Sequence, residues 1–260
     1  MRIFPDANIV NLRATDKMFG NCSCTKIVYI CRMVISNTSC YLLVIVVMVL
    51  SLIVQKVLSR RFDVYSEVPS PHGLTGADVA RLMLKQNGIG NVKVECIDGT
   101  LTDHYDPNAR IISLSTGVYG GASVAACAVA AHETGHAIQH ATGYAPLKFR
   151  SLIVPAVSFC NRTVQWVLII GLLLLNVTPS LLYVGIALFA FTTLFSFITL
   201  PVEINASQRA VQWLERSGIT DAVTTPMAKD ALKWAAYTYV VAALGSLATL
   251  FYYIGLSRSR

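Results

Sequence analysis

The sequence predicts a multi-pass α-helical membrane protein with about four spans and a small α+β domain on the cytoplasmic side. Of its 260 residues, 54% are hydrophobic and only 13% are charged, whereas a soluble domain usually carries about 25% charged residues. The mean hydropathy is +0.56. Three long stretches contain no charged residue at all: 33–55, 163–202 and 234–257. Each could cross the apolar core of a bilayer, because a crossing helix needs about 20 residues.

The three uncharged stretches predict four membrane spans. The first and third stretches fit one span each. The middle stretch is long enough for two spans, and the turn-forming sequence NVTPS divides it. We therefore place the spans at 36–56, 161–176, 181–201 and 236–255. The sequence SLIVPAVSFCNRT either lengthens the second span or lies along the membrane interface.

The spans divide the chain into further segments. A cytoplasmic domain is expected at 57–160, followed by the span hairpin at 161–201. A second cytoplasmic segment, which is helical, is expected at 202–235, and the last span with its tail occupies 236–260. The formal net charge is +7, but the basic residues cluster beside the spans, as in the positive-inside pattern. The expected partner is therefore the lipid bilayer of the plasma membrane rather than nucleic acid. No oligomeric state is specified.

Residues 1–35 fit this plan poorly. We expect them to be an N-terminal extension that is poorly ordered or that precedes the true start. They contain three cysteines whose spacing is not that of a standard zinc knuckle: Cys22, Cys24 and Cys31. Three later cysteines are predicted to be free, buried thiols: Cys96, Cys127 and Cys160.

The cytoplasmic domain is expected to contain a helix, two strands and a second helix. Thr75 and Asp78 have the spacing of a capping box at the start of the first helix, which Gly88 or Gly90 ends. The alternating sequence VKVECI predicts a half-buried strand, and RIISLS predicts a second strand that could pair with an extended substrate at the edge of the sheet. The sequence DGTLTDHYDPNA between them is dense in turn-forming residues and predicts a loop.

The second helix is expected to begin at Ser123 and to end at Ala141, and it carries the motif His132-Glu133-x-x-His136. Residues four apart project from the same face of a helix, so the two imidazoles can bind one Zn²⁺ per chain. Glu133 is rotated by about 100° from His132, so it need not be a ligand and can instead accept a proton from the attacking water. A pair of structural histidines is the alternative, but it would be an unusual choice in an alanine-rich helix.

A catalytic zinc site needs a third protein ligand, and Glu203 is the best candidate. It follows the predicted hairpin by two residues, in the first turn of an expected new helix, and a hairpin that returns across the bilayer would bring it beside the histidines. The competing interpretation is that Glu203 is only a charge at a helix N-terminus. His140 and Asp106 are the next candidates, although one straight helix rarely supplies three ligands to a tetrahedral site.

Three classes of function are compatible with such a site. The leading class is a zinc endopeptidase. The second is a membrane scaffold or binding protein with a structural zinc, for which a fourth ligand such as His104 or Asp106 would be evidence. The third is a transporter, which is disfavoured because the three apolar stretches that form the spans contain no charged residue.

Several long segments resemble the YugP-type membrane zinc metallopeptidases, an H-E-x-x-H family similar in logic to the HtpX and CAAX proteases. The similar segments cover the chain from about residue 57 to the last span and include YSEVPSPHGLTGADVA, LTDHYDP, ISLSTGVY, AAHETGHAIQ, GYAPLKFRS, LPVEINASQRA and WAAYTYVVAAL.

The resemblance implies a multi-pass membrane peptidase that acts on protein or peptide substrates, most naturally membrane-associated ones. It implies zinc ligands His132, His136 and Glu203 and the catalytic base Glu133. The family usually has aspartate at the position of Asn205, so a charge next to the ligand shell is lost here. Two further residues, His104 and Tyr105, are candidates to support the ligands or donate hydrogen bonds in the transition state, but a plain loop role is the favoured interpretation for both.

Overall fold

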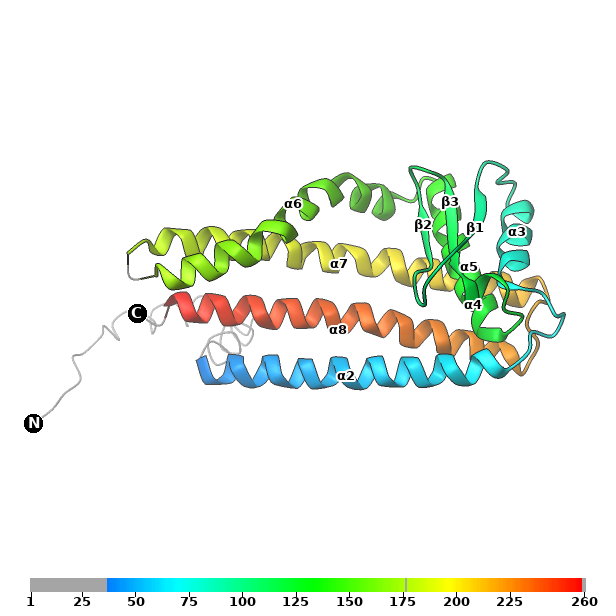
Figure 1. The fold of residues 1–260 in the computed structure, drawn as a ribbon, viewed down its shortest axis with the longest axis horizontal. Coiled ribbons are helices and arrows are strands. Elements are labelled where there is room, and N and C mark those ends of the chain that lie inside the picture. Colours follow the sequence, from blue (N-terminus) through cyan, green and yellow to red (C-terminus); the bar gives the residue numbers. More distant parts are fainter. Residues whose placement is uncertain (1–36, 176, 259–260) are drawn as a thin grey trace, which may run out of the picture.

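The computed structural model describes residues 37–175 and 177–258. The N-terminal extension 1–35, with its predicted cysteine cluster, lies outside the described residues. Four long helices dominate the molecule and run side by side along its length (Figure 1). Their bounds are α2 Asn37–Glu67, α6 Ala145–Leu173, α7 Pro179–Arg216 and α8 Thr224–Arg258.

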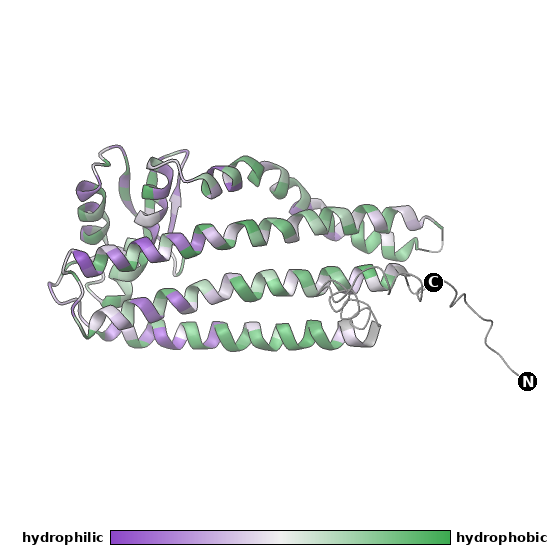
Figure 2. Ribbon diagram, turned by 180° about the vertical axis from the view of Figure 1, so that it is seen from behind, coloured by the Kyte–Doolittle hydropathy of each residue, from purple (hydrophilic) through white to green (hydrophobic). Residues whose placement is uncertain are grey.

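All four long helices are long and apolar enough to cross a membrane. Their most apolar windows have mean hydropathies of 2.6, 1.4, 2.2 and 1.7, yet only 11–28% of each window is buried within the chain. So much exposed apolar surface is unfavourable in water and is expected in contact with lipid. Polar segments gather at the end of the molecule that carries the sheet (Figure 2). The chain is therefore a membrane protein with four candidate spanning helices.

The helices extend beyond the predicted spans. α2 continues to Glu67, whereas the sequence placed the end of the span at 56. α6 begins at Ala145 rather than near 161, so the SLIVPAVSFCNRT sequence is helical and lengthens the second span helix. Pro155 lies inside α6, and the helix changes direction part-way along its length (Figure 1). Prolines inside helices are the usual cause of such bends.

The prediction that Glu203 begins a new helix is wrong. Helix α7 runs without interruption from the apolar segment through Pro201 to Arg216. The part after Pro201 stays helical because it buries one side at a regular spacing of four residues, through Val202, Ala206, Ala210 and Leu214. The packing of this face stabilises the helix despite the proline.

The polar end of the molecule contains a small α+β unit. Its elements are α3 Gly76–Gln86, β1 Lys93–Ile97, β2 His104–Asp106, β3 Ile111–Ser115, α4 Thr116–Tyr119 and α5 Val124–Ala141. The sheet has the order β1-β3-β2, with β1 parallel and β2 antiparallel to β3.

Two predictions about this sheet need correction. The sequence 98–109 was expected to be a loop, but it contains the short strand β2. The predicted substrate-pairing strand RIISLS is β3, which lies in the centre of the sheet. Its hydrogen-bonding groups are used by β1 and β2 on its two sides, so β3 has no free edge for a substrate.

The helix ends of the α+β unit agree with the sequence. Thr75 and Asp78 form the capping box of α3, with both reciprocal hydrogen bonds present. The hydroxyl of Ser123 accepts a hydrogen bond from Ala126 at the start of α5. α5 ends at Ala141, and Gly143 follows in a left-handed conformation, φ +67°, which suits glycine at this position.

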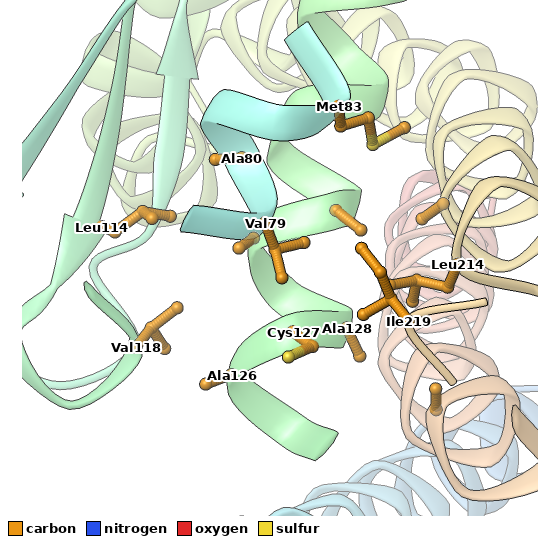
Figure 3. Packing of buried hydrophobic residues seen from close by; sticks show 14 of the residues in the cluster. Val79, Ala80, Met83, Leu114, Val118, Ala126, Cys127, Ala128, Leu214 and Ile219 are labelled. Carbon is orange, nitrogen blue, oxygen red and sulfur yellow. The ribbon is translucent and has the colours of Figure 1, made fainter. Parts of the chain in front are cut away.

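Helices α3 and α5, strand β3 and the end of α7 enclose one hydrophobic core (Figure 3). Figure 3 shows Val79 and Met83 of α3 directed toward α5 and Leu214 approaching from α7. Cys127 is buried in this core and Cys160 is buried in α6, as predicted. Cys96 is exposed, contrary to prediction, because β1 is an edge strand.

Candidate metal centre

Helix α5 presents both histidines of the motif on one face. The rings of His132 and His136 have centroids 4.8 Å apart and lie nearly perpendicular to each other. Glu133 and His136 are each only 9% exposed. The two imidazoles therefore form a preformed pair in a largely dry environment.

Glu203 of α7 faces this pair. Its Oε2 lies 3.4 Å from Nε2 of His132 and 3.5 Å from Nε2 of His136. The approach of α7 to α5 depends on Gly135, since a Cβ at this position would lie only 2.8 Å from the backbone oxygen of Ala206. The missing side chain lets the two helices touch and brings the carboxylate to the histidines.

The geometry of these three residues fits a zinc ion. Ligand atoms about 2.0–2.1 Å from a tetrahedral zinc are about 3.4 Å apart, close to the observed Nε2–Oε2 distances of 3.4 and 3.5 Å. Glu203 is 3% exposed, and its Oε2 has no hydrogen-bond partner. A buried carboxylate oxygen without a partner is costly, and a bound cation would relieve that cost.

Each histidine is also oriented from behind, through its other nitrogen. Nδ1 of His132 lies 3.1 Å from Oγ of Ser207, and Nδ1 of His136 lies 3.1 Å from Oε1 of Gln139. When Nδ1 donates these bonds, the lone pair of Nε2 is free for a metal. Both Nε2 atoms face Glu203.

Gln139 is itself fixed by α7. Its Nε2 donates to the backbone oxygen of Val202 at 2.8 Å and to Oδ1 of Asn205 at 3.0 Å. This assigns the amide orientation and leaves Oε1 for His136. Nε of Arg209 also donates to Oδ1 of Asn205, at 2.8 Å. Asn205 thus keeps the accepting role that an aspartate would have, while the negative charge beside Arg209 is absent.

The charges of the centre favour a positive species. Burial by itself would lower the pKa of His136, but its interactions with Glu203 and with the charge of Glu133 outweigh burial and raise the pKa above its ordinary value. Two carboxylates beside two imidazoles therefore stabilise positive charge between them.

The structure brings the three predicted ligands together, with Glu133 and Asn205 beside them, and four other candidate residues do not join the ligand group. Within the described part of the chain, the group of ligand atoms within 4.8 Å of one another contains only His132, His136 and Glu203. The four others have local partners. Nδ1 of His104 contacts the Thr102 backbone oxygen, Tyr105 contacts His140, and Asp106 accepts from the backbone of Asn108 and Ala109.

Two residues of the centre were not predicted from the sequence. Gln139 is three residues after His136, and this spacing places it on the same helical side, so the spacing alone could have suggested contact. Tyr239 of α8 lies close enough to Glu203 and Glu133 for their charges to act on its hydroxyl. It lies in the segment WAAYTYVVAAL, but no motif spacing in the sequence connects it to α5.

Comparison with known proteins agrees with this geometry. Residues 40–258 match the model of a family described as "Putative neutral zinc metallopeptidase". The chain is 43% identical over 193 residues to the "Putative membrane protease YugP" of Bacillus subtilis (strain 168), covering 74% of this chain and 85% of that protein. No solved structure gives a significant match. The expected resemblance to YugP-type proteins is confirmed.

Proposed function

The chain belongs to this family of neutral zinc metallopeptidases, and we propose that it is a membrane-embedded, zinc-dependent endopeptidase acting on membrane or juxtamembrane segments of proteins. The observation that carries the proposal is the convergence of His132, His136 and the unpartnered Oε2 of Glu203 beside Glu133.

Each residue has a distinct task in this proposal. His132, His136 and Glu203 would hold one zinc ion per chain. When bound, zinc would polarise the carbonyl of the peptide bond and lower the pKa of a water molecule. Glu133 takes the proton from the attacking water and passes it to the nitrogen of the leaving amine, which breaks the peptide bond.

Tyr239 is a better candidate than His104 or Tyr105 for donating a hydrogen bond to the oxygen of the carbonyl under attack. Its hydroxyl lies near the charges of Glu203 and Glu133, whereas the hydroxyl of Tyr105 is engaged with His140 at 2.8 Å. A donor aimed at the developing negative charge stabilises the transition state.

The number of ligands supports catalysis over a structural zinc site. Structural zinc sites usually have four protein ligands, whereas catalytic sites have three and an open position. Among the residues that the structure describes, neither His104 nor Asp106 joins the ligand group. The described residues therefore supply no fourth ligand of the kind that would favour a scaffold with a structural zinc site.

The proposed active centre faces the cytoplasm. The support is the distribution of basic residues along the sequence, since Lys56, Arg60 and Arg61 follow the first uncharged stretch and Lys148 and Arg150 precede the second. Cytoplasmic flanks of membrane proteins would then be the accessible substrates at the membrane surface.

The substitution Glu133→Gln tests the proposal. Glutamine has nearly the same shape but cannot accept a proton, so the variant should keep its zinc and lose at least about 100-fold in the rate of peptide hydrolysis. Both quantities are measured on protein purified in detergent, with Glu95→Gln, an exposed carboxylate on β1, as the control. Wild-type turnover in the Glu133→Gln variant would refute the assigned base.

A further inference from the structure

A large cavity ends about one helical turn from the candidate metal centre along α5 and α8, and it has no role in the mechanism above. It has a volume of about 1030 Å³ and lies between α2, the turn at 99–103, the start of α5 and helix α8. This is large enough for several amino-acid side chains or for a drug-sized ligand.

The cavity reaches the face of α5 that carries Glu133. Ala126 and Val129 line it, and Glu133 follows them on the same face of the helix, at the spacing i, i+3 and i+7. Val129 is one turn before Glu133, about 6 Å along the helix axis. On α8, Ala235 lines the cavity and Tyr239 follows it by one turn. Both helices therefore lead from the cavity to the proposed active centre.

The cavity wall is acidic as well as apolar. Asp63, Glu67 and Asp103 line it, and no described Lys, Arg or His does. The carboxylate of Asp103 is occupied, because both of its oxygens accept hydrogen bonds from Ser115. It is thus a fixed negative charge in the wall.

Asp63 and Glu67 are four residues apart on one face of α2, and both are exposed. No described cation forms an ion pair with either of them, since the ion pairs of the described chain involve other carboxylates. Like charges at this spacing repel each other slightly. A positive group entering the cavity would remove that repulsion.

The cavity also begins where α2 leaves its apolar segment. Gln55, the last residue of the uncharged stretch 33–55, lines it together with Leu58 and Phe62. An occupant at this level therefore meets apolar walls and carboxylates close to the membrane surface. Segments that combine apolar residues with an excess of Lys and Arg are typical of the cytoplasmic flanks of membrane proteins.

We propose that this cavity binds the cytoplasmic juxtamembrane segment of a membrane-protein substrate, and that Asp63 and Glu67 select segments carrying Lys or Arg. The inference rests on the proposed peptidase function and on its cytoplasmic orientation. The cavity would thus be a specificity subsite beside the N-terminal half of α5, and the preferred substrates would be positively charged.

The test uses full-length protein in nanodiscs of neutral phosphatidylcholine. The probes are three synthetic substrates with the same transmembrane helix and with flanks of equal length, rich in Lys, Gln or Glu. Hydrolysis is measured with wild type, and binding is measured by fluorescence anisotropy with Glu133→Gln at low and high salt. The Lys-rich flank should have a KM and a Kd about 3- to 10-fold lower than those of the Gln-rich flank, and salt should reduce the difference.

The variants show whether the preference comes from the cavity. The double variant Asp63→Asn/Glu67→Gln should lose the preference for Lys, and Asp63→Lys/Glu67→Lys should prefer the Glu-rich flank, with zinc content unchanged. The control Glu95→Gln/Glu215→Gln removes the same charge from exposed carboxylates outside the cavity and should keep the preference.

Two outcomes would overturn the inference. One is equal binding of all three flanks, and the other is a preference that the cavity variants and the control change alike. A cavity that holds a lipid headgroup instead of a peptide would give the first outcome. Failure of wild type to hydrolyse any of the three substrates would refute the proposed function instead. In that case, the relative affinities of the three flanks for Glu133→Gln would still show whether the cavity selects positively charged segments.

Discussion

At the scale of single residues, the candidate metal centre depends on side chains other than its three predicted ligands. Gln139 connects His136 of α5 to the backbone of Val202 and to Asn205 of α7. It is fully buried and joins a predicted ligand on one helix to the segment that carries the other. Partners of this kind commonly decide the affinity of a metal site.

We predict that Gln139→Ala lowers the zinc affinity by about 10- to 100-fold, because His136 loses the bond that orients its ring. Competition with a chelator in detergent solution measures the affinity. Asn91→Ala, at an exposed position outside the centre, is the matched control. Equal affinities for the two variants would show that Gln139 does not position the ligand.

The departure at Asn205 illustrates what the sequence can and cannot predict. The sequence predicts that the residue lies near the ligands and that a charge is missing. Only the structure shows that Oδ1 of Asn205 accepts from both Gln139 and Arg209, so the hydrogen-bonding role survives without the charge. The participation of Gln139 and Tyr239 likewise depends on the packing of α5 against α7 and α8, which no local pattern specifies.

At the scale of elements, the contact between α5 and α7 sets the geometry of the centre. A Cβ on Gly135 would meet the backbone oxygen of Ala206 at 2.8 Å. Backbone atoms cannot rotate aside as a flexible side chain can, so the whole helix α7 would have to move. Glu203 is one turn before Ser207 on that helix and would move with it.

We expect Gly135→Ala to destabilise the protein by about 1–3 kcal/mol through overpacking and to reduce zinc retention at the same time. Thermal unfolding and zinc content of the purified variant measure the two effects. Gly90→Ala is the control, since a Cβ at Gly90 meets nothing within 4 Å. Retention of both wild-type properties by Gly135→Ala would contradict the tight contact.

Elements with strong local signals were predictable, and elements defined by long-range contacts were not. The capping box of α3 and the Ser123 cap of α5 are local, and both are present. Strand β2 was missed because its sequence is rich in turn formers, and only its pairing with β3 makes it a strand. The boundary at Pro201 was wrong because packing on α5 keeps α7 helical beyond the proline.

At the scale of the whole molecule, one prediction concerns the side of the membrane on which the proposed active centre lies. Cys96 is an exposed natural reporter in the α+β unit. Cys127 is fully buried, and burial raises the pKa of its thiol to about 11, so it stays protonated and unreactive at neutral pH.

In a variant with Cys22, Cys24, Cys31 and Cys40 replaced by serine, we predict that Cys96 reacts with a membrane-impermeant maleimide only after the cells are permeabilised. The same variant with Cys96→Ser supplies the background. Labelling of Cys96 in intact cells would show that the α+β unit lies outside the cytoplasm and would contradict the proposed topology.

We propose that α5 and α7 together hold one zinc ion through His132, His136 and Glu203, and the zinc content of Glu203→Ala is the decisive test of this claim. Two histidines alone hold zinc weakly, so this variant should retain far less than the wild type, which should hold about one zinc per chain, and should lose hydrolysis with it. Glu215→Ala on the same helix removes an exposed carboxylate and should keep the wild-type zinc content. Full zinc occupancy with normal hydrolysis in Glu203→Ala would contradict the claim.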